Sequence, residues 1–315
     1  MSPRRTHVTT GPYAPPVPHS ELTVTSADGA RLYAEIHGPD DAPTVVLAHG
    51  WTCSTAFWAA VVRDLVVDHR VVVYDQRGHG RSPAPASRGG YSTTALADDL
   101  GAVLQATLRT GERAVLAGHS MGAMTLMAAA DRPYLRERAA ALLLCSTGAS
   151  KLRLESRVFP VGPRSVRNFA HRALLLSRMP LGPVTGLAKG LLKYGTMAPG
   201  STPAEVEACA YIVHACPRKV RGAWGRVLAS LDLDGEVRRM AVPTAVVQGT
   251  ADRLTPPVHA RRLGAALPNC LGVTELPGKG HMTPVEAPDV VAGAIRGLVG
   301  EYLPQTAKVA EEESA

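Results

Sequence analysis

The sequence predicts the α/β fold class, with a doubly wound, mostly parallel sheet and a helical lid inserted after the sixth core strand. Three observations predict this architecture. Short apolar runs alternate with segments of helical spacing from residue 44 onward. The runs are almost continuously apolar, as in parallel strands that are buried on both faces. The alternation stops near Gly148 and resumes near Pro243, and the stretch between shows helical patterns broken by glycine and proline.

The first twenty residues are polar and rich in proline, so residues 1–20 are predicted to be a flexible N-terminal arm. Arg4-Arg5 is followed by no apolar segment, which argues against an export signal. The five cysteines include no C-x-x-C pair, which argues against a disulfide framework or a zinc site and favours a reducing compartment. We therefore expect a cytoplasmic protein.

The core elements follow in order. Segments 21–26 and 30–38 alternate apolar and polar residues around Asp28-Gly29 and predict a β-hairpin. Buried strands that run into loops are predicted within 44–50, 69–82, 113–120, 139–147, 243–253 and 271–281. Helices are predicted over 55–67, 93–109, 121–130, 257–267 and 286–301.

These elements divide the chain into parts. Residues 21–149 and 233–302 are predicted to form the core, residues 150–232 the helical lid, and residues 303–315 a flexible acidic tail. No run reaches the roughly 18 apolar residues of a transmembrane helix, so we expect no integral membrane segment. Ligand sites in doubly wound sheets lie at the carboxyl ends of the strands, so functional residues are expected in the loops after the strands.

The segment LAGHSMGAM places Ser120 between Gly118 and Gly122, where a strand turns into a helix. Such a sharp turn pushes a serine hydroxyl outward, and glycines leave room where strand and helix meet. A serine hydroxyl is a weak nucleophile unless a base accepts its proton. Ser120 is therefore a candidate nucleophile that needs a base and an acid from elsewhere in the chain.

Two later loops offer these groups. His281 follows the last predicted strand in PGKGHMTP, and Asp252 follows the preceding strand in GTADRLTP. An acid beside the histidine fixes the imidazole tautomer and stabilises the imidazolium ion. The alternative for Asp252 is a helix cap or an ion pair with Arg253.

Four other aspartates are less suited to the role of the acid. Asp98 and Asp99 lie in the middle of a predicted helix and are expected to face solvent. Asp232 and Asp234 flank the end of the predicted lid and are the reserve candidates. Asp252 is preferred because it directly follows a buried strand.

The sequence resembles the α/β-hydrolase fold family, of the serine esterase and lipase type, over roughly residues 21–301. The resemblance rests on five motifs in the family's order: HGW (49–51), DQRGHGRS (75–82), GHSMG (118–122), GTADRLTP (249–256) and GKGHMTP (278–284). It implies that Ser120 is the nucleophile, Asp252 the acid and His281 the base. It also implies an oxyanion hole made by the backbone N–H groups of Trp51 and Met121.

The other polar residues of these motifs are expected to support the loops. We assign His49, Asp75 and His79 a structural role, and we expect Arg77 to pair with loop carbonyl groups.

The resemblance implies a reaction class. Relatives of this fold that hydrolyse epoxides or haloalkanes use an aspartate nucleophile, so Ser120 favours acyl transfer. We expect a hydrolase that cleaves a carboxylic ester with a hydrophobic acyl group or a lipid-like substrate, through an acyl-enzyme on Ser120 and with no cofactor or metal. A thioesterase, an acyltransferase or a tailoring enzyme of secondary metabolism would use the same triad. A ligand-binding protein without catalysis is a further alternative.

The predicted lid bears on the partners. Residues 167–195 combine leucines with arginines and lysines, which indicates either a basic amphipathic surface in weak contact with a lipid interface or an ordinary pair of lid helices. We favour the ordinary pair, whose apolar side faces the core. The basic residues are spread along the chain without interleaved aromatics, so no nucleic-acid partner is expected. The expected partner is a small hydrophobic ester, and the oligomeric state stays open.

Overall fold

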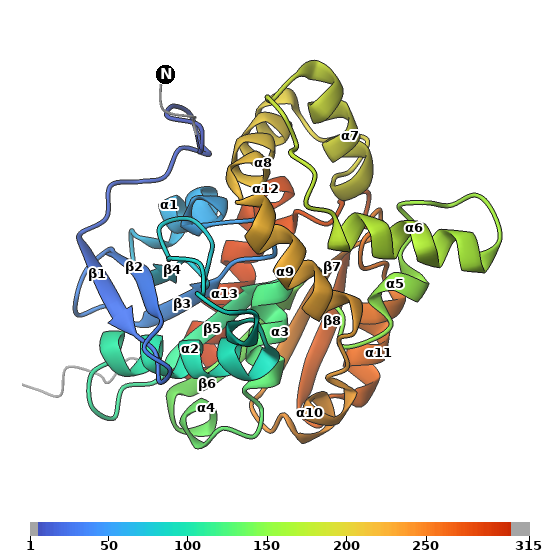
Figure 1. Cartoon of the computed structure of the whole chain (residues 1–315). Helices are drawn as coiled ribbons and strands as arrows, with labels where there is room; N and C mark the ends of the chain where they lie inside the picture. The colour runs from blue at the N-terminus through green and yellow to red at the C-terminus, as the bar shows by residue number, and fades with distance from the viewer. Residues whose placement is uncertain (1–5, 304–315) are drawn as a thin grey trace, which may run out of the picture.

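An eight-stranded sheet forms the centre of the protein in a computed structural model that describes residues 6–303 (Figure 1). The strands lie side by side in the order β1-β2-β4-β3-β5-β6-β7-β8. The predicted hairpin is β1 and β2, and β2 is also antiparallel to β4, whereas the other neighbours are parallel. The strands are β1 (Ser20–Thr25), β2 (Arg31–His37), β3 (Thr44–Ala48), β4 (Arg70–Tyr74), β5 (Ala114–His119), β6 (Ala139–Cys145), β7 (Thr244–Gly249) and β8 (Cys270–Leu276).

Helices cover both faces of this sheet, so the predicted fold class is confirmed (Figure 1). The helices of the described chain are η1 (Thr55–Trp58), α1 (Ala59–Leu65), η2 (Arg88–Gly90), α2 (Thr93–Thr107), α3 (Met121–Ala128), α4 (Pro133–Arg138), α5 (Leu152–Glu155), α6 (Arg164–Leu176), α7 (Gly186–Thr196), α8 (Pro203–Ala215), α9 (Arg218–Ala229), α10 (Asp234–Arg239), α11 (Val258–Ala266), α12 (Thr283–Glu286) and α13 (Pro288–Tyr302). The sequence pattern did not reveal α4 and α10, which have six residues each. Helices this short show less than two turns of periodicity.

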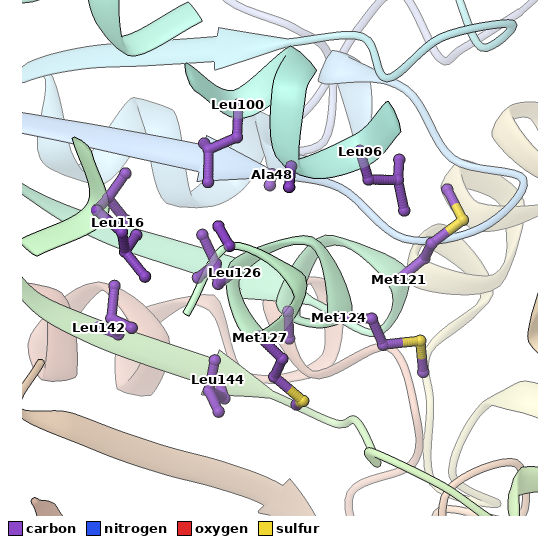
Figure 2. Close-up of a cluster of buried hydrophobic side chains, with 14 of the residues drawn as sticks. Ala48, Leu96, Leu100, Leu116, Met121, Met124, Leu126, Met127, Leu142 and Leu144 are labelled. Atoms are coloured by element: carbon purple, nitrogen blue, oxygen red, sulfur yellow. The ribbon is translucent and has the colours of Figure 1, made fainter. Parts of the chain in front are cut away.

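The central strands are apolar on both sides because each side faces its own core. In β3, Val46 and Ala48 face a core that includes side chains of α2, α3 and α9. Val45 and Leu47 face a second core that includes side chains of α1 and α13. Figure 2 shows the first core, where methionines of α3 lie beside leucines of the neighbouring strands. This packing fixes the start of α3, and with it the turn that carries Ser120.

Six helices, α5 to α10, lie between β6 and β7, and the first five, α5 to α9, belong to the inserted segment. The insertion follows the sixth strand, where the sequence pattern predicted it. An isolated antiparallel bridge joins Ser150 to Asp232, and the Ser150 hydroxyl donates to the Asp234 carboxylate at 2.9 Å. The two ends of the inserted segment therefore meet beside the sheet. The division into core and lid at these residues stays a prediction.

Part of the predicted flexible arm contacts the rest of the protein. The Arg63 guanidinium donates to the carbonyl oxygen of Ala14 at 2.9 and 3.0 Å, and the Tyr13 hydroxyl lies 3.4 Å from Glu205 of α8. Residues 1–5 of the predicted arm and 304–315 of the predicted acidic tail lie outside the described residues. Within residues 6–303, no helix combines the length and the apolar character needed to cross a bilayer.

The expectation that Asp99 faces solvent is wrong. Asp99 lies on the inner side of α2, only 1% exposed, and its carboxylate accepts hydrogen bonds from both Nε and Nη2 of Arg77. Arg77 is also 1% exposed and makes a second ion pair with Asp28 at 2.8 Å. Arg77 was expected to pair with loop carbonyl groups, but it pairs mainly with the two carboxylates. The carbonyl oxygen of Gly90 is a further acceptor.

Replacing Asp99 with asparagine should destabilise the fold by about 3 kcal/mol, because it leaves a buried guanidinium short of its compensating charge. The neighbouring Asp98→Asn variant is a matched control, since Asp98 pairs with Arg132 while about a third of its side chain remains exposed. That variant should cost less than about 1 kcal/mol. Urea unfolding of the two variants measures the difference, and equal losses would contradict a special role for the buried pair.

Candidate active site

Ser120 lies on a strained turn between β5 and α3. Its backbone angles are φ +50° and ψ −114°, in a region that few residues other than glycine adopt. The two flanking glycines are required by close backbone contacts. A Cβ atom at Gly122 would lie 2.1 Å from the carbonyl oxygen of Ala48, and one at Gly118 would lie 2.5 Å from the nitrogen of Ala123. The sequence therefore folds into a tight elbow that holds Ser120 at the carboxyl end of β5.

Asp252 and His281 lie together, as the sequence predicted. The Asp252 Oδ2 atom is 2.8 Å from His281 Nδ1, and both residues are almost fully buried. Asp252 also accepts hydrogen bonds from the backbone N–H groups of Leu254 and Thr255 at 2.8 and 2.9 Å. Asp252 therefore orders its own turn and also contacts the imidazole, but it does not cap a helix, because α11 begins at Val258 with Pro257 at its N-cap. No ion pair with Arg253 is present among the described residues.

The environment of Asp252 favours the ionised carboxylate. Burial by itself raises the pKa of Asp252, but attraction to His281 and the hydrogen bonds from His281, Thr255 and Gln248 outweigh it and lower the pKa below its usual value. An ionised acid at this place keeps the proton of the imidazole on Nδ1 and leaves Nε2 free to accept another. The reserve candidates Asp232 and Asp234 lie instead at the base of the insertion, beside Ser150.

Three further residues order this site, and the sequence patterns did not single them out. The Thr255 hydroxyl donates to Asp252 at 2.9 Å and lies 3.2 Å from His281 Nδ1. The Gln248 amide donates to Asp252 at 3.0 Å. His119 lies next to Ser120 in the chain, and its Nε2 donates to the carbonyl oxygen of His281 at 2.8 Å. His119 is part of the GHSMG motif, but the sequence gave no sign of its contact with the His281 loop.

His119 connects the serine turn to the histidine loop. Its ring lies 4.9 Å from the ring of His281, and burial together with the charge of His281 lowers the pKa of His119 to about 3. His119 is therefore neutral at physiological pH and can keep a fixed tautomer with the proton on Nε2. Close packing at Gly50 supports the arrangement, since a Cβ atom there would lie 2.6 Å from His119 Nδ1.

The proposed oxyanion donors are the amides of Trp51 and Met121. Met121 is the first residue of α3, where an N–H group has no acceptor within the helix. Among residues 6–303, neither amide donates a hydrogen bond to another protein group. The Trp51 side chain is anchored separately, because its Nε1 donates to the carbonyl oxygen of Arg221 at 3.0 Å. Both N–H groups are therefore available to a ligand.

The polar residues of the other motifs contact the backbone, as expected for structural roles. His49 Nε2 accepts from the amide of Gln76 at 3.0 Å, and His79 Nε2 accepts from the amide of Thr52 at 3.2 Å. Asp75 accepts from the amides of Thr55 and Arg81 at 2.8 Å each. These bonds hold the loop that contains Trp51 against the loop after β4.

A cavity of about 710 Å³ joins these groups to the insertion. Ser120, His281 and Trp51 line one part of it, and apolar side chains from α5 to α9 line much of the rest. One basic residue stands out: Arg221 of α9 is 6% exposed, lines the cavity and donates to the carbonyl oxygen of Met179. Within residues 6–303, no three histidine, cysteine, aspartate or glutamate side chains come together as metal ligands.

Comparison with known proteins identifies the family of this chain. Residues 45–294 match the model of the family described as the alpha/beta hydrolase family. The chain is 31% identical over 252 residues to the putative carbamate hydrolase RutD of Variovorax paradoxus, which covers 79% of this chain and 89% of that protein. It is 35% identical over 175 residues to the probable oxidoreductase EphD of Mycobacterium tuberculosis, covering 54% of this chain but only 29% of the length of that relative.

A solved structure shows the same arrangement of elements. An esterase from Thermogutta terrifontis is 26% identical and superposes with a TM-score of 0.72, covering 90% of this chain and 99% of that chain. The family model extends over most of the residues that form the sheet and its helices. The protein therefore belongs to the alpha/beta hydrolase family.

Proposed function

We propose that this protein is a serine hydrolase that cleaves carboxylic esters with a hydrophobic acyl group, through an acyl-enzyme on Ser120. One observation carries the proposal. Ser120 on its strained turn and His281, which is paired with Asp252, line the same largely apolar cavity. A nucleophile, a base with a fixed tautomer and a site for the substrate are then present in one place.

The reaction follows from these positions. His281 Nε2 accepts the proton of Ser120 as Oγ attacks the ester carbonyl, and the amides of Trp51 and Met121 donate to the oxyanion. The imidazolium, stabilised by Asp252, then protonates the leaving alcohol oxygen as the C–O bond breaks. Water repeats the sequence on the acyl-enzyme and releases the carboxylic acid.

The insertion is proposed to act as the lid of this site. The His281 amide donates to the carbonyl oxygen of Thr196, the last residue of α7, at 2.9 Å. The backbone of Gly280 also packs against the insertion, since a Cβ atom at this position would lie 2.5 Å from the nitrogen of Ala198. The cavity wall contributed by the insertion consists mainly of leucine, valine and aromatic side chains, which suits an apolar acyl chain.

The relatives suggest other acyl substrates for the same machinery. RutD is named for carbamates, and a carbamate carbonyl would be attacked by the same three side chains. The cavity of about 710 Å³ with a mostly apolar wall favours a larger ester. Thioesters and acyl transfer to an alcohol remain the alternatives with the same triad, because both proceed through the same acyl-enzyme.

A fluorophosphonate probe tests the proposal directly. We expect one adduct per chain, located on the peptide that contains Ser120, and turnover of p-nitrophenyl esters that increases with chain length until the cavity is filled. Addition of competing alcohols distinguishes hydrolysis from transfer, since a transferase would form a new ester. A chain that neither reacts with the probe nor turns over esters would contradict the proposal and favour the ligand-binding alternative.

A further inference from the structure

The positive charge of the protein comes from one part of the insertion. Basic residues occur throughout the chain, whereas one segment has no acidic residues to balance them. Residues 156–204 contain seven arginines and lysines and no aspartate or glutamate. Because the whole chain has 34 basic and 27 acidic residues, the remainder has 27 of each and is neutral. The net charge of +7 thus belongs to a segment of α6, α7 and the flanking loops.

The same segment exposes most of the large apolar side chains on the surface. Of the fifteen such residues exposed in the described chain, eleven lie between residues 154 and 194. They are Leu154, Phe159, Val161, Val166, Phe169, Leu174, Met179, Leu181, Leu187, Leu191 and Tyr194. We name these residues, together with Arg157, Arg164, Arg172 and Arg178, the α6–α7 surface. Exposed apolar groups that gather in this way mark an interaction site rather than a random distribution.

The two helices contact the body of the protein on one side only. Gly225 of α9 allows a close approach by α6, because a Cβ atom at Gly225 would lie 1.8 Å from the carbonyl oxygen of Leu175. The opposite side of α6 exposes Val166 and Phe169, which are 57% and 74% exposed. In α7, Leu187, Leu191 and Tyr194 follow at intervals of four and three residues and form an exposed stripe. Figure 1 shows both helices at the edge of the molecule.

This surface continues into the cavity that contains Ser120. Six of its apolar residues are exposed and also line that cavity: Phe159, Val161, Leu174, Leu181, Leu191 and Tyr194. An apolar path therefore leads from the outer surface to the nucleophile, which is itself only 9% exposed. The four arginines of the surface are exposed and, among the described residues, form no ion pair with a carboxylate.

We propose that the α6–α7 surface docks on an anionic lipid bilayer, with the mouth of the cavity facing the lipid. Exposed apolar side chains would enter the headgroup region while the arginines contact anionic headgroups. A second copy of the chain fits less well, because a two-fold contact through this surface would place unpaired arginines against each other. Docking itself does not depend on the proposed function. The further step, in which the docked enzyme takes its ester from the bilayer, rests on the proposed function.

Vesicle sedimentation tests docking separately from catalysis. The protein used is the full chain with Ser120→Ala, so that lipid is not consumed. Vesicles of phosphatidylcholine alone are compared with vesicles in which a third of the lipid is phosphatidylglycerol. We expect binding to the mixed vesicles that weakens at high salt, and much weaker binding to the neutral ones.

Two variants test the two components of the surface without altering the cavity lining. Arg164→Gln with Arg172→Gln should weaken binding to anionic vesicles by roughly 25-fold, since each cation near such a membrane contributes about five-fold. Phe169→Ser with Leu187→Ser removes two apolar groups that lie outside the cavity and should weaken binding at least ten-fold. The matched control is Arg31→Gln with Val67→Ser, two exposed positions elsewhere, which should bind as the parent does.

The outcomes are distinct. Hydrolysis of a short soluble ester, measured with Ser120 restored, should be unchanged in all three double variants and shows that they are folded. No binding to mixed vesicles, or equal loss in the control variant, would overturn the proposal. If light scattering showed a dimer that only the surface variants dissociate, with no vesicle binding, the surface would be a contact between chains and the proposal would be wrong. Loss of esterase activity with docking intact would contradict the proposed function alone.

Discussion

Replacing Ser120 with alanine should lower kcat for ester hydrolysis by about a millionfold, because the nucleophile of a triad acts as a unit with its base. The free energy of unfolding should change by less than about 0.5 kcal/mol. Alanine keeps the Cβ atom and so meets the same strain at φ +50°. The Ser120 side chain also makes no capping hydrogen bond to α3 that the variant would lose. Ester turnover and urea unfolding measure the two effects separately.

The control is Ser177→Ala, which removes the hydroxyl of another serine that lines the cavity. That variant should retain kcat within a few-fold and should still react with a fluorophosphonate. Comparable losses in both variants would mean that the cavity, rather than an activated hydroxyl at position 120, controls turnover. Full activity of Ser120→Ala would exclude the acyl-enzyme mechanism.

The three predicted catalytic residues are far apart in the chain, and yet their proximity was predictable. Each follows the carboxyl end of a strand: Ser120 follows β5, Asp252 follows β7 and His281 follows β8. Parallel strands place their carboxyl ends at one edge of the sheet, so residues in these loops converge whatever the length of chain between them. The strands themselves were predictable because burial on both faces leaves a continuous apolar run in the sequence.

The partners of buried polar residues were harder to predict. Asp99 lies 22 residues after Arg77, and its position in the middle of a helix gave no sign that this helix turns it inward. The contacts of His119, Thr255 and Gln248 depend in the same way on how loops approach one another in space. Local periodicity reports which side of an element is buried, but it does not identify the group on the other side of a contact.

The inserted helices show a related limit. Their leucines and arginines fit an ordinary amphipathic pattern, in which the apolar side is buried against the protein. In the structure, α7 has no fully buried residue and α6 has only His171. The pattern gave the correct element type for this region, but only the tertiary structure reveals that many of its apolar side chains remain exposed.

Replacing Asp252 with asparagine should lower kcat by about 10⁴-fold and leave the protein folded. The reason lies in the orientation that the new side chain must adopt. Oδ1 of Asp252 faces two backbone donors, the amides of Leu254 and Thr255, which do not rotate. The asparagine oxygen must occupy that position, so its NH₂ group takes the place of Oδ2 and faces His281 Nδ1. Steady-state turnover of a p-nitrophenyl ester at neutral pH measures the loss.

This orientation reverses the tautomer of the base. An NH₂ group donates to Nδ1, so the imidazole proton moves to Nε2, and Nε2 is then unable to accept a proton from Ser120. Asp232→Asn and Asp234→Asn are the matched controls, because both carboxylates lie at the base of the insertion and should leave kcat unchanged. If Asp234→Asn abolished turnover while Asp252→Asn retained it, the acid of the triad would lie elsewhere. The large loss is expected at Asp252 alone because it is the ionised carboxylate that contacts Nδ1 and keeps the proton on that nitrogen.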